Sequence, residues 1–311
     1  MKIKSITTTL ENIPLKTPFI TSLRKVESVE FVRVIVESDL GIESIGEAPA
    51  TKAITGEDII TIQTAIENNK NKFIGLNVYE SFEKVDSLEI GSSAKAALDM
   101  AFYNLLNPMK NRTDKKTAIT ISYNETKKML FDANVAVGSK NDILKVKLGQ
   151  NIDHAIEVTK KIKQQNPNAL IMIDANQAWN YNDTIKYIDS IKSIDIELIE
   201  QPVKKDDLEG LKKITSYSNI KIVADESCFN IDEVKTIVEN NIADIINIKL
   251  MKCGGITKAI EILEYCSQEE VPVMMGSMLE GPISIKYASS LADTYKDVVK
   301  YIDLDSPLLY K

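Results

Sequence analysis

The sequence has little of what marks secreted or membrane-spanning proteins. Its three cysteines, Cys228, Cys253 and Cys266, form no CxxC pair and are odd in number, which favours reduced thiols over a disulfide framework. No apolar run reaches the roughly 18 residues that a membrane helix needs, and the first residues alternate like a strand, unlike a signal peptide. We therefore expect a cytoplasmic protein without a membrane partner.

Lysine and arginine form no dense block, and the net charge of the chain is −7. Nucleic acid is therefore not an expected partner, because phosphate backbones require clustered positive charge. The composition, 44% hydrophobic and 27% charged over 311 residues, is that of a globular chain long enough for one barrel or two domains.

Residues 1–112 are predicted to form a small α+β domain that caps the rest of the chain. The turn signals and the alternation of apolar residues predict strands, and the helical periodicity follows them. The predicted elements are three strands and then two helices, at residues 3–12, 29–37, 42–48, 56–72 and 92–106.

Residues 113–311 contain eight short apolar runs that each end in polar or charged residues. Seven of these ends, from Lys147 to Asp305, recur at intervals of 24 to 28 residues. That interval is the length of one strand, loop and helix, so it predicts a (β/α)8 barrel whose strand ends meet at one face. The predicted strands are residues 118–122, 144–148, 170–174, 197–200, 220–225, 245–249, 271–276 and 299–305.

The last unit of the predicted barrel is incomplete. Only residues 306–311 follow its final strand, so the eighth helix is missing. We expect either a neighbouring subunit of a homo-oligomer or a rearranged N-terminal domain to cover the gap.

Three carboxylates, Asp174, Glu200 and Asp225, stand at consecutive predicted strand ends in the words IDANQAW, IEQP and ADES. One carboxylate at such a position is more often a helix cap or a solvated loop residue. Three in register would repel one another without a cation, and Mg²⁺ prefers carboxylate oxygens. The pattern therefore indicates a Mg²⁺ site.

Lysines flank these acids. Lys145 and Lys147 are two residues apart in ILKVKLG, so both point to the same face of one strand, and Lys249 stands on a nearly opposite strand. The alternative is a strand end exposed to water. A lysine beside a cation and another lysine has its charged form disfavoured, so we expect a lowered pKa that suits a base.

The words KVK, DAN, EQP, DES, NIKLMKCGG and GSMLE, together with IGEAP and AITGED, resemble the enolase superfamily in its muconate-lactonizing subgroup across nearly the whole chain. The resemblance implies that Lys147 and Lys249 form an acid/base pair on opposite faces of the substrate, and that Lys145 holds the substrate carboxylate. One lysine would remove an α-proton and the other would return a proton to the opposite face. It also implies one Mg²⁺ per subunit and its ligands, Asp174, Glu200 and Asp225.

Asp303 and Asp305 are two residues apart in VKYIDLDSPLL, so both face inward and form an anionic clamp for an ammonium group. A clamp on a strand away from the metal fits the free N-terminus of a dipeptide better than it fits a single amino acid. The pair is similar to that of the dipeptide epimerases, where it binds the α-ammonium of the substrate. The alternative is a solvated acidic strand end.

Arg24 lies in PFITSLRKVESVE between the first two predicted strands, and its planar cation can pair with a carboxylate. A lone surface arginine ordinarily serves only solubility. The loop is similar to the mobile lid of this superfamily, and its arginine resembles that of the Ala-Glu epimerases, so the implied substrate is L-Ala-D/L-Glu from murein. Thr120, Ser277 and Met278 match substrate-lining positions, with packing as their alternative role.

Two other interpretations stay open at this point. The first is another Mg²⁺-dependent enolate reaction, muconate cycloisomerisation or o-succinylbenzoate synthesis, whose substrates lack an amine for Asp303 and Asp305. The second is a non-catalytic barrel that binds a metal and a ligand. The presence of both Lys147 and Lys249 argues against it, because binding alone needs no base on each face.

Overall fold

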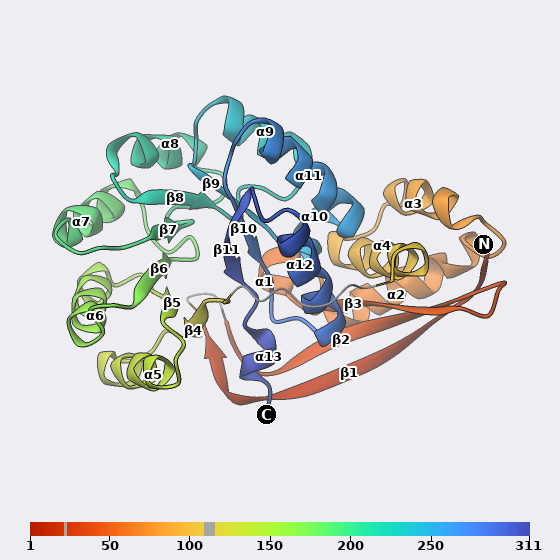
Figure 1. Ribbon diagram of the computed structural model, residues 1–311, viewed down its shortest axis with the longest axis horizontal. Coiled ribbons are helices and arrows are strands. Elements are labelled where there is room, and N and C mark those ends of the chain that lie inside the picture. The colour runs from red at the N-terminus through yellow and green to blue at the C-terminus, as the bar shows by residue number, and fades with distance from the viewer. Residues whose placement is uncertain (22–23, 109–115) are drawn as a thin grey trace.

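The computed structural model describes residues 1–21, 24–108 and 116–311. A three-stranded antiparallel sheet with its helices forms the N-terminal part, and an eight-stranded parallel sheet forms a nearly closed barrel beside it (Figure 1). This architecture confirms the predicted fold class. The predicted boundary between residues 112 and 113 lies outside the described residues.

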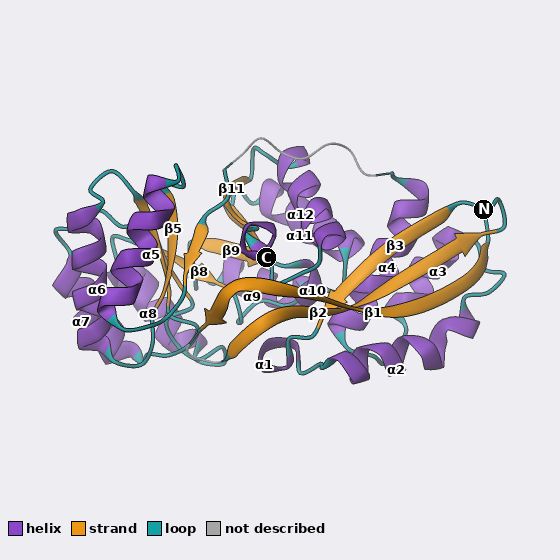
Figure 2. Ribbon diagram, turned by 90° about the horizontal axis from the view of Figure 1, so that it is seen from below, coloured by secondary structure: helices purple, strands orange, loops and turns teal. Residues whose placement is uncertain are grey.

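The first two strands are longer than predicted. They are β1 (Ile3–Ile20) and β2 (Lys25–Ser38). Their antiparallel pairing runs from Ile3 opposite Ser38 to Ile20 opposite Lys25. The prediction of a long loop between these two strands is wrong, because most of its residues belong to the paired strands. The two strands extend from the N-terminal part to the barrel (Figures 1 and 2).

The third strand of this sheet, β3 (Glu43–Pro49), packs against the long helix α4 (Ser92–Leu106). Gly46 permits the close approach, because a Cβ atom there would collide with the carbonyl oxygen of Ala97. Helix α3 (Val78–Asp86) was not predicted from the sequence, although Asn77 and Glu80 form a capping box at its start. The other helices here are α1 (Lys52–Thr55), α2 (Ile59–Asn69) and α3 (Val78–Asp86), with a 3₁₀ turn at Lys70–Lys72.

The barrel alternates strands with outer helices (Figure 1). Its strands are β4 (Ile119–Ile121), β5 (Ile143–Lys147), β6 (Leu170–Asp174), β7 (Leu198–Glu200), β8 (Lys221–Ala224), β9 (Ile245–Ile248), β10 (Val273–Gly276) and β11 (Val299–Asp303). Its helices are α5 (Thr126–Gly138), α6 (Ile152–Gln165), α7 (Tyr181–Ile191), α8 (Leu208–Tyr217), α9 (Ile231–Glu239), α10 (Leu250–Cys253), α11 (Ile256–Gln268), α12 (Pro282–Thr294) and α13 (Ser306–Leu309).

Strand alternation sorts the barrel interior into layers. Toward the amino ends of the strands, a separate apolar cluster fills the barrel: Ala118, Met172, Leu198, Val223, Ile245 and Met274. Two residues further along most of these strands, the inward positions are polar, as at Asp174, Glu200, Asp225 and Asn247. The apolar layer therefore forms the floor beneath the polar end of the barrel.

The barrel closes weakly between its last and first strands. The sheet order runs from β11 to β4 without a ladder joining these two, and the main-chain N–H of Ala118 donates to the carbonyl of Ile302 at 2.9 Å. The predicted missing helix is reduced to one turn, α13. That turn contacts the N-terminal strand, since the N–H of Lys311 donates to the carbonyl of Pro14 at 2.9 Å and Leu15 bridges to Tyr310.

In the part of the chain that the structure describes, no helix is long and apolar enough to cross a membrane. The three cysteines are free thiols, as predicted, and Cys228 and Cys266 are buried. Burial raises the pKa of the Cys228 thiol to about 11, which favours an unreactive structural role.

Candidate active site

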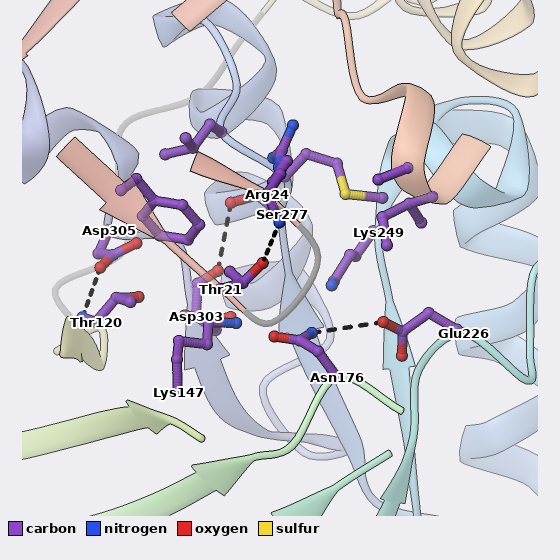
Figure 3. Close-up of a pocket in the computed structure, with 15 residues that line it drawn as sticks. Thr21, Arg24, Thr120, Lys147, Asn176, Glu226, Lys249, Ser277, Asp303 and Asp305 are labelled. Atoms are coloured by element: carbon purple, nitrogen blue, oxygen red, sulfur yellow. Dashed lines mark hydrogen bonds between the residues drawn. The ribbon is translucent and has the colours of Figure 1, made fainter. Parts of the chain in front are cut away.

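A pocket lies at the carboxyl ends of the barrel strands, where the ends of β1 and β2 meet the barrel (Figure 3). It contains most of the predicted substrate and acid/base residues: Arg24, Thr120, Lys147, Lys249, Ser277, Met278, Asp303 and Asp305. The other four, Lys145, Asp174, Glu200 and Asp225, do not line it and are almost completely buried. The sequence pattern therefore selected residues that the fold brings to one place.

The three predicted metal ligands are adjacent. Asp174 ends β6 and pairs in register with Glu200 at the end of β7, and Asp225 follows β8 directly. Each is at most 1% exposed. Burial and then the neighbouring charge of Asp174 raise the pKa of Glu200 to about 7, although the charge of Lys145 lowers it.

The two predicted acid/base lysines come from opposite sides of the barrel. The Nζ of Lys147, on β5, lies 2.5 Å from Asp174 Oδ2, and the Nζ of Lys249, after β9, lies 2.6 Å from Asp225 Oδ2. Figure 3 shows both side chains reaching toward the pocket from different sides. In the protein alone, burial lowers the pKa of Lys249, but the charges of Asp225 and Glu200 outweigh burial and raise it. The lowered pKa expected for a lysine beside a cation stays a prediction.

Lys145 lies beneath the pocket. Its Nζ is 2.6 Å from both Glu200 Oε2 and Asp303 Oδ2, and 3.3 Å from Asp174 Oδ2. These carboxylates outweigh the effect of burial and raise the pKa of Lys145 well above its ordinary value. One fixed ammonium therefore links the predicted metal ligands to the predicted ammonium clamp.

The two clamp residues line the pocket on the β11 side. Asp305 Oδ2 accepts a hydrogen bond from the main-chain N–H of Thr120 at 2.7 Å, and the hydroxyl of Ser277 donates to the main-chain carbonyl of Asp303 at 3.4 Å. Burial and then the charge of Asp303 raise the pKa of Asp305 to about 6. A cation placed at this pair would relieve the repulsion between the carboxylates.

Arg24 stands on the pocket wall beside Thr21 and Phe19, at the far end of β1 and β2. Burial lowers the pKa of its guanidinium. Within residues 1–21, 24–108 and 116–311, no carboxylate forms an ion pair with it; the ion pairs of these residues lie elsewhere. A partly desolvated guanidinium without an anionic partner favours a ligand that carries a carboxylate.

Sequence reasoning missed several pocket residues. Asn176 has a positive φ of 44°, and its Nδ2 donates to Glu226 Oε1 at 3.4 Å (Figure 3). Both follow predicted ligands closely, Asn176 two positions after Asp174 in DAN and Glu226 one position after Asp225 in DES, so the residues just past each carboxylate were a usable signal. Ile54, in the one-turn helix α1, and Leu279, in a loop, also line the pocket, but an isolated apolar residue gives no such signal.

The donor set suits Mg²⁺, although the acids now face lysines. Among the described residues, no three His, Cys, Asp or Glu side chains are grouped so as to hold a metal ion. However, three buried carboxylates stand at the ends of neighbouring strands. The buried Oε2 of Glu200 forms an ion pair with Lys145, but the two groups do not have the geometry of a hydrogen bond. Hard oxygen donors of this kind are what Mg²⁺ requires, so the residues fit the ion.

Comparisons with known proteins agree with this geometry. The family described as "Enolase C-terminal domain-like" matches residues 131–308. A protein of Sulfurimonas denitrificans named L-amino acid-D/L-Glu epimerase is 50% identical over 323 residues, which cover 100% of this chain and 95% of that protein.

Two solved structures are similar over the full chain. The substrate-liganded L-Ala-D/L-Glu epimerase from Bacillus subtilis is 35% identical, with 100% of this chain and 92% of that chain covered and a TM-score of 0.94. The dipeptide epimerase from Enterococcus faecalis V583, complexed with Mg and the dipeptide L-Leu-L-Tyr, is 34% identical with the same coverage and a TM-score of 0.94.

Proposed function

Because the chain belongs to the enolase superfamily, in its muconate-lactonizing subgroup, we propose that it is a Mg²⁺-dependent dipeptide epimerase. The reaction inverts the α-carbon of the C-terminal residue, and the substrate is L-Ala-D/L-Glu. The observation that carries the proposal is the placement of Lys147 and Lys249 on opposite sides of one pocket, with the Asp303–Asp305 clamp beside them.

In this proposal one Mg²⁺ per subunit is held by Asp174, Glu200 and Asp225. When bound, Mg²⁺ stabilises the negative charge that develops on the substrate carboxylate as the α-proton leaves. Asp225 would then share its charge with the ion, and the 2.6 Å ion pair that raises the pKa of Lys249 would weaken. Lys249 then releases and accepts a proton more readily.

The lysines carry out the proton transfer. One amine takes the α-proton, and the ammonium on the other side of the substrate donates a proton to the opposite face of the same carbon. The configuration therefore inverts, and each epimer has its own base. Two bases are necessary because one side chain cannot reach both faces of a fixed substrate.

The clamp and Lys145 position the dipeptide. The ammonium of the substrate takes the place of Lys145 at Asp303, whose Oδ2 now lies 2.6 Å from Lys145 Nζ. Lys145 is thereby released to hold the substrate carboxylate, which remains a prediction for this residue. Asp305 completes the clamp, and Thr120, Ser277 and Met278 line the space around the peptide.

Arg24 supports glutamate as the epimerised residue, because its guanidinium pairs with a side-chain carboxylate. The relatives differ in the dipeptides that their names and structures mention. We place the enzyme in the cytoplasm, which its free thiols support. We also propose a role in the recycling of peptidoglycan peptides. A homo-oligomer is the proposed assembly.

A dipeptide screen tests the function. Purified protein with Mg²⁺ is expected to convert L-Ala-L-Glu to L-Ala-D-Glu, detected by chiral chromatography, and to lose this activity in EDTA. It is expected to leave N-acetyl-L-Ala-L-Glu unchanged, because that compound has no ammonium for Asp303 and Asp305. Turnover of muconate or of the o-succinylbenzoate precursor, without turnover of any dipeptide, would favour the rival enolate reactions.

A further inference from the structure

Lys252 is a buried lysine that the proton-transfer scheme does not use. It lies in the one-turn helix α10, three residues after Lys249, and is 2% exposed. Its ammonium donates to three oxygens: Asp225 Oδ1 at 2.7 Å, the main-chain carbonyl of Asp225 at 2.6 Å and that of Asn247 at 2.8 Å. An ammonium has three protons, so all of its hydrogen bonds are formed.

Asp225 is thus held from two directions. Lys249 reaches Oδ2 from the active-site pocket. Lys252 reaches Oδ1 from a separate cavity of about 360 Å³ that lies between the barrel and the N-terminal helices, with the ring of Phe229 at 5.7 Å from its ammonium. When Lys249 moves away, Oδ2 becomes available and Oδ1 stays bound.

The same ammonium is connected to a second carboxylate. Asn247, whose carbonyl accepts from Lys252, donates through its side-chain Nδ2 to Glu200 Oε1 at 2.8 Å. Asn247 is fully buried, so its side chain has little freedom to choose another partner. Glu200 therefore has Oε1 held by Asn247, while Oε2 forms the 2.6 Å ion pair with Lys145, the lysine that the substrate carboxylate would draw away.

We propose that Lys252 is a positioning residue for the Mg²⁺ site: it fixes Asp225 and Asn247 so that Asp225 offers Oδ2 and Glu200 offers Oε2 to the ion. The inference rests on the proposed function. It predicts the direction in which Mg²⁺ affinity changes when Lys252 is replaced, because a nearby positive charge repels a cation. If charge alone mattered, removing the ammonium would tighten Mg²⁺ binding, whereas loss of positioning weakens it.

Isothermal titration calorimetry of Mg²⁺ into the metal-free full-length protein measures whether the affinity rises or falls. Lys252→Met is expected to raise the Mg²⁺ dissociation constant by about 10- to 100-fold, the effect typical of losing a group that orients a metal ligand. Excess Mg²⁺ is expected to restore most of kcat. Lys258→Met is the matched control, because Lys258 borders the same cavity but pairs with Asp86 and Glu261.

The variant Asp225→Asn shows whether a negative result contradicts the role of Lys252 or the proposed metal site itself. If Asp225→Asn loses Mg²⁺ binding while Lys252→Met binds as tightly as the unaltered protein or more tightly, Lys252 has no positioning role. If Asp225→Asn binds Mg²⁺ normally, the metal site itself is wrong. Should Lys252→Met not fold, Lys252→Arg decides: it keeps the charge but cannot place three donors on these oxygens, so unchanged binding overturns the proposal.

Discussion

At the scale of single residues, the site is a set of opposite charges that hold one another in place. Lys147 and Lys249 each contact one carboxylate, and Lys145 contacts three. Buried ion pairs of this kind are costly to form, and breaking one leaves an uncompensated buried charge. In the proposed mechanism, a cation and a zwitterionic substrate would replace the lysines as partners of these carboxylates.

Arg24→Met is expected to reduce kcat/KM for L-Ala-L-Glu by about 10- to 100-fold, the value of a lost hydrogen bond to a charged group. Turnover of a dipeptide with an uncharged C-terminal side chain, such as L-Ala-L-Met, is expected to change little. Steady-state kinetics on both substrates measures the split. An equal loss on both would mean that Arg24 supports the fold of the pocket and does not contact glutamate.

A buried carboxylate outside the catalytic set gives the fold a dependence on pH. Burial raises the pKa of Glu280 to about 7, although Ser284 and the N–H of Met278 donate to it. The folded state therefore holds this proton more tightly than the unfolded chain. The stabilisation is complete below the unfolded pKa, near 4.5, and is lost as the pH rises through 7.

Glu280→Gln removes this proton equilibrium. Relative to the unaltered protein, the variant is expected to gain roughly 3 kcal/mol of unfolding free energy between pH 4.5 and 8, since one pKa unit corresponds to about 1.4 kcal/mol. Urea unfolding at several pH values measures the difference, with the exposed Glu269→Gln as the control. A difference between Glu280→Gln and the unaltered protein that does not vary with pH would contradict this assignment.

At the scale of elements, two carboxylates of the N-terminal part cap barrel helices that begin at glycine. Asp99 Oδ2 on α4 accepts from the N–H groups of Ile256 and Thr257 at the start of α11. Glu47 Oε2 on β3 accepts from Ile283 at the start of α12. A Cβ at either N-cap glycine would collide with the capping acid, so these caps also fix how the two parts meet.

Asp99→Ala is expected to lower the free energy of unfolding by about 1 to 3 kcal/mol, because it leaves buried N–H groups of α11 without acceptors. Asp86→Ala is the control: it removes an exposed ion pair to Lys258 at the same cavity, for which about 0.5 kcal/mol is expected. Urea unfolding compares them. Equal losses would mean that the cap across the two parts contributes nothing beyond a surface charge.

The spacing of the barrel strands was predictable because the inward-facing residues alternate and each strand is buried. The same alternation placed Asp174, Glu200 and the lysines on one face. The continuation of β1 to Ile20 was not predictable, since its polar residues are held in a strand only by pairing with β2. Lys252 was missed for a related reason: a one-turn helix gives no periodicity, and its partners come from other strands.

At the scale of the whole molecule, the one-turn helix α13 stands where the eighth barrel helix was expected, and a groove lies on the outside of β11 and β4. The groove holds about 400 Å³ and is lined in part by Ile285, Ile302, Leu304 and Leu308. Tyr310 and Lys311, which follow α13, contact β1 at Leu15 and Pro14. The N-terminal strand thus accounts for part of the expected shielding, and a neighbouring subunit remains the proposal for the rest.

Sedimentation velocity at several protein concentrations tests that assembly. A homo-oligomer is expected, because the exposed apolar part of the groove, at Leu308, gains free energy when it is covered. Leu308→Glu, in the groove, is expected to shift the population toward monomer. A protein that sediments only as a monomer near 34.7 kDa would contradict the proposal and leave the groove exposed.

The account depends most on the two lysines, and proton NMR in D₂O tests them directly. Incubation of L-Ala-L-Glu with the enzyme and Mg²⁺ is expected to replace the glutamate α-proton by deuterium in both epimers. Lys147→Ala and Lys249→Ala are each expected to abolish epimerisation. Each variant is expected to exchange the α-proton of only one epimer for deuterium, and the two variants are expected to act on different epimers. Absence of deuterium at the α-carbon with the unaltered enzyme, or exchange of both epimers in either variant, would contradict the two-base mechanism.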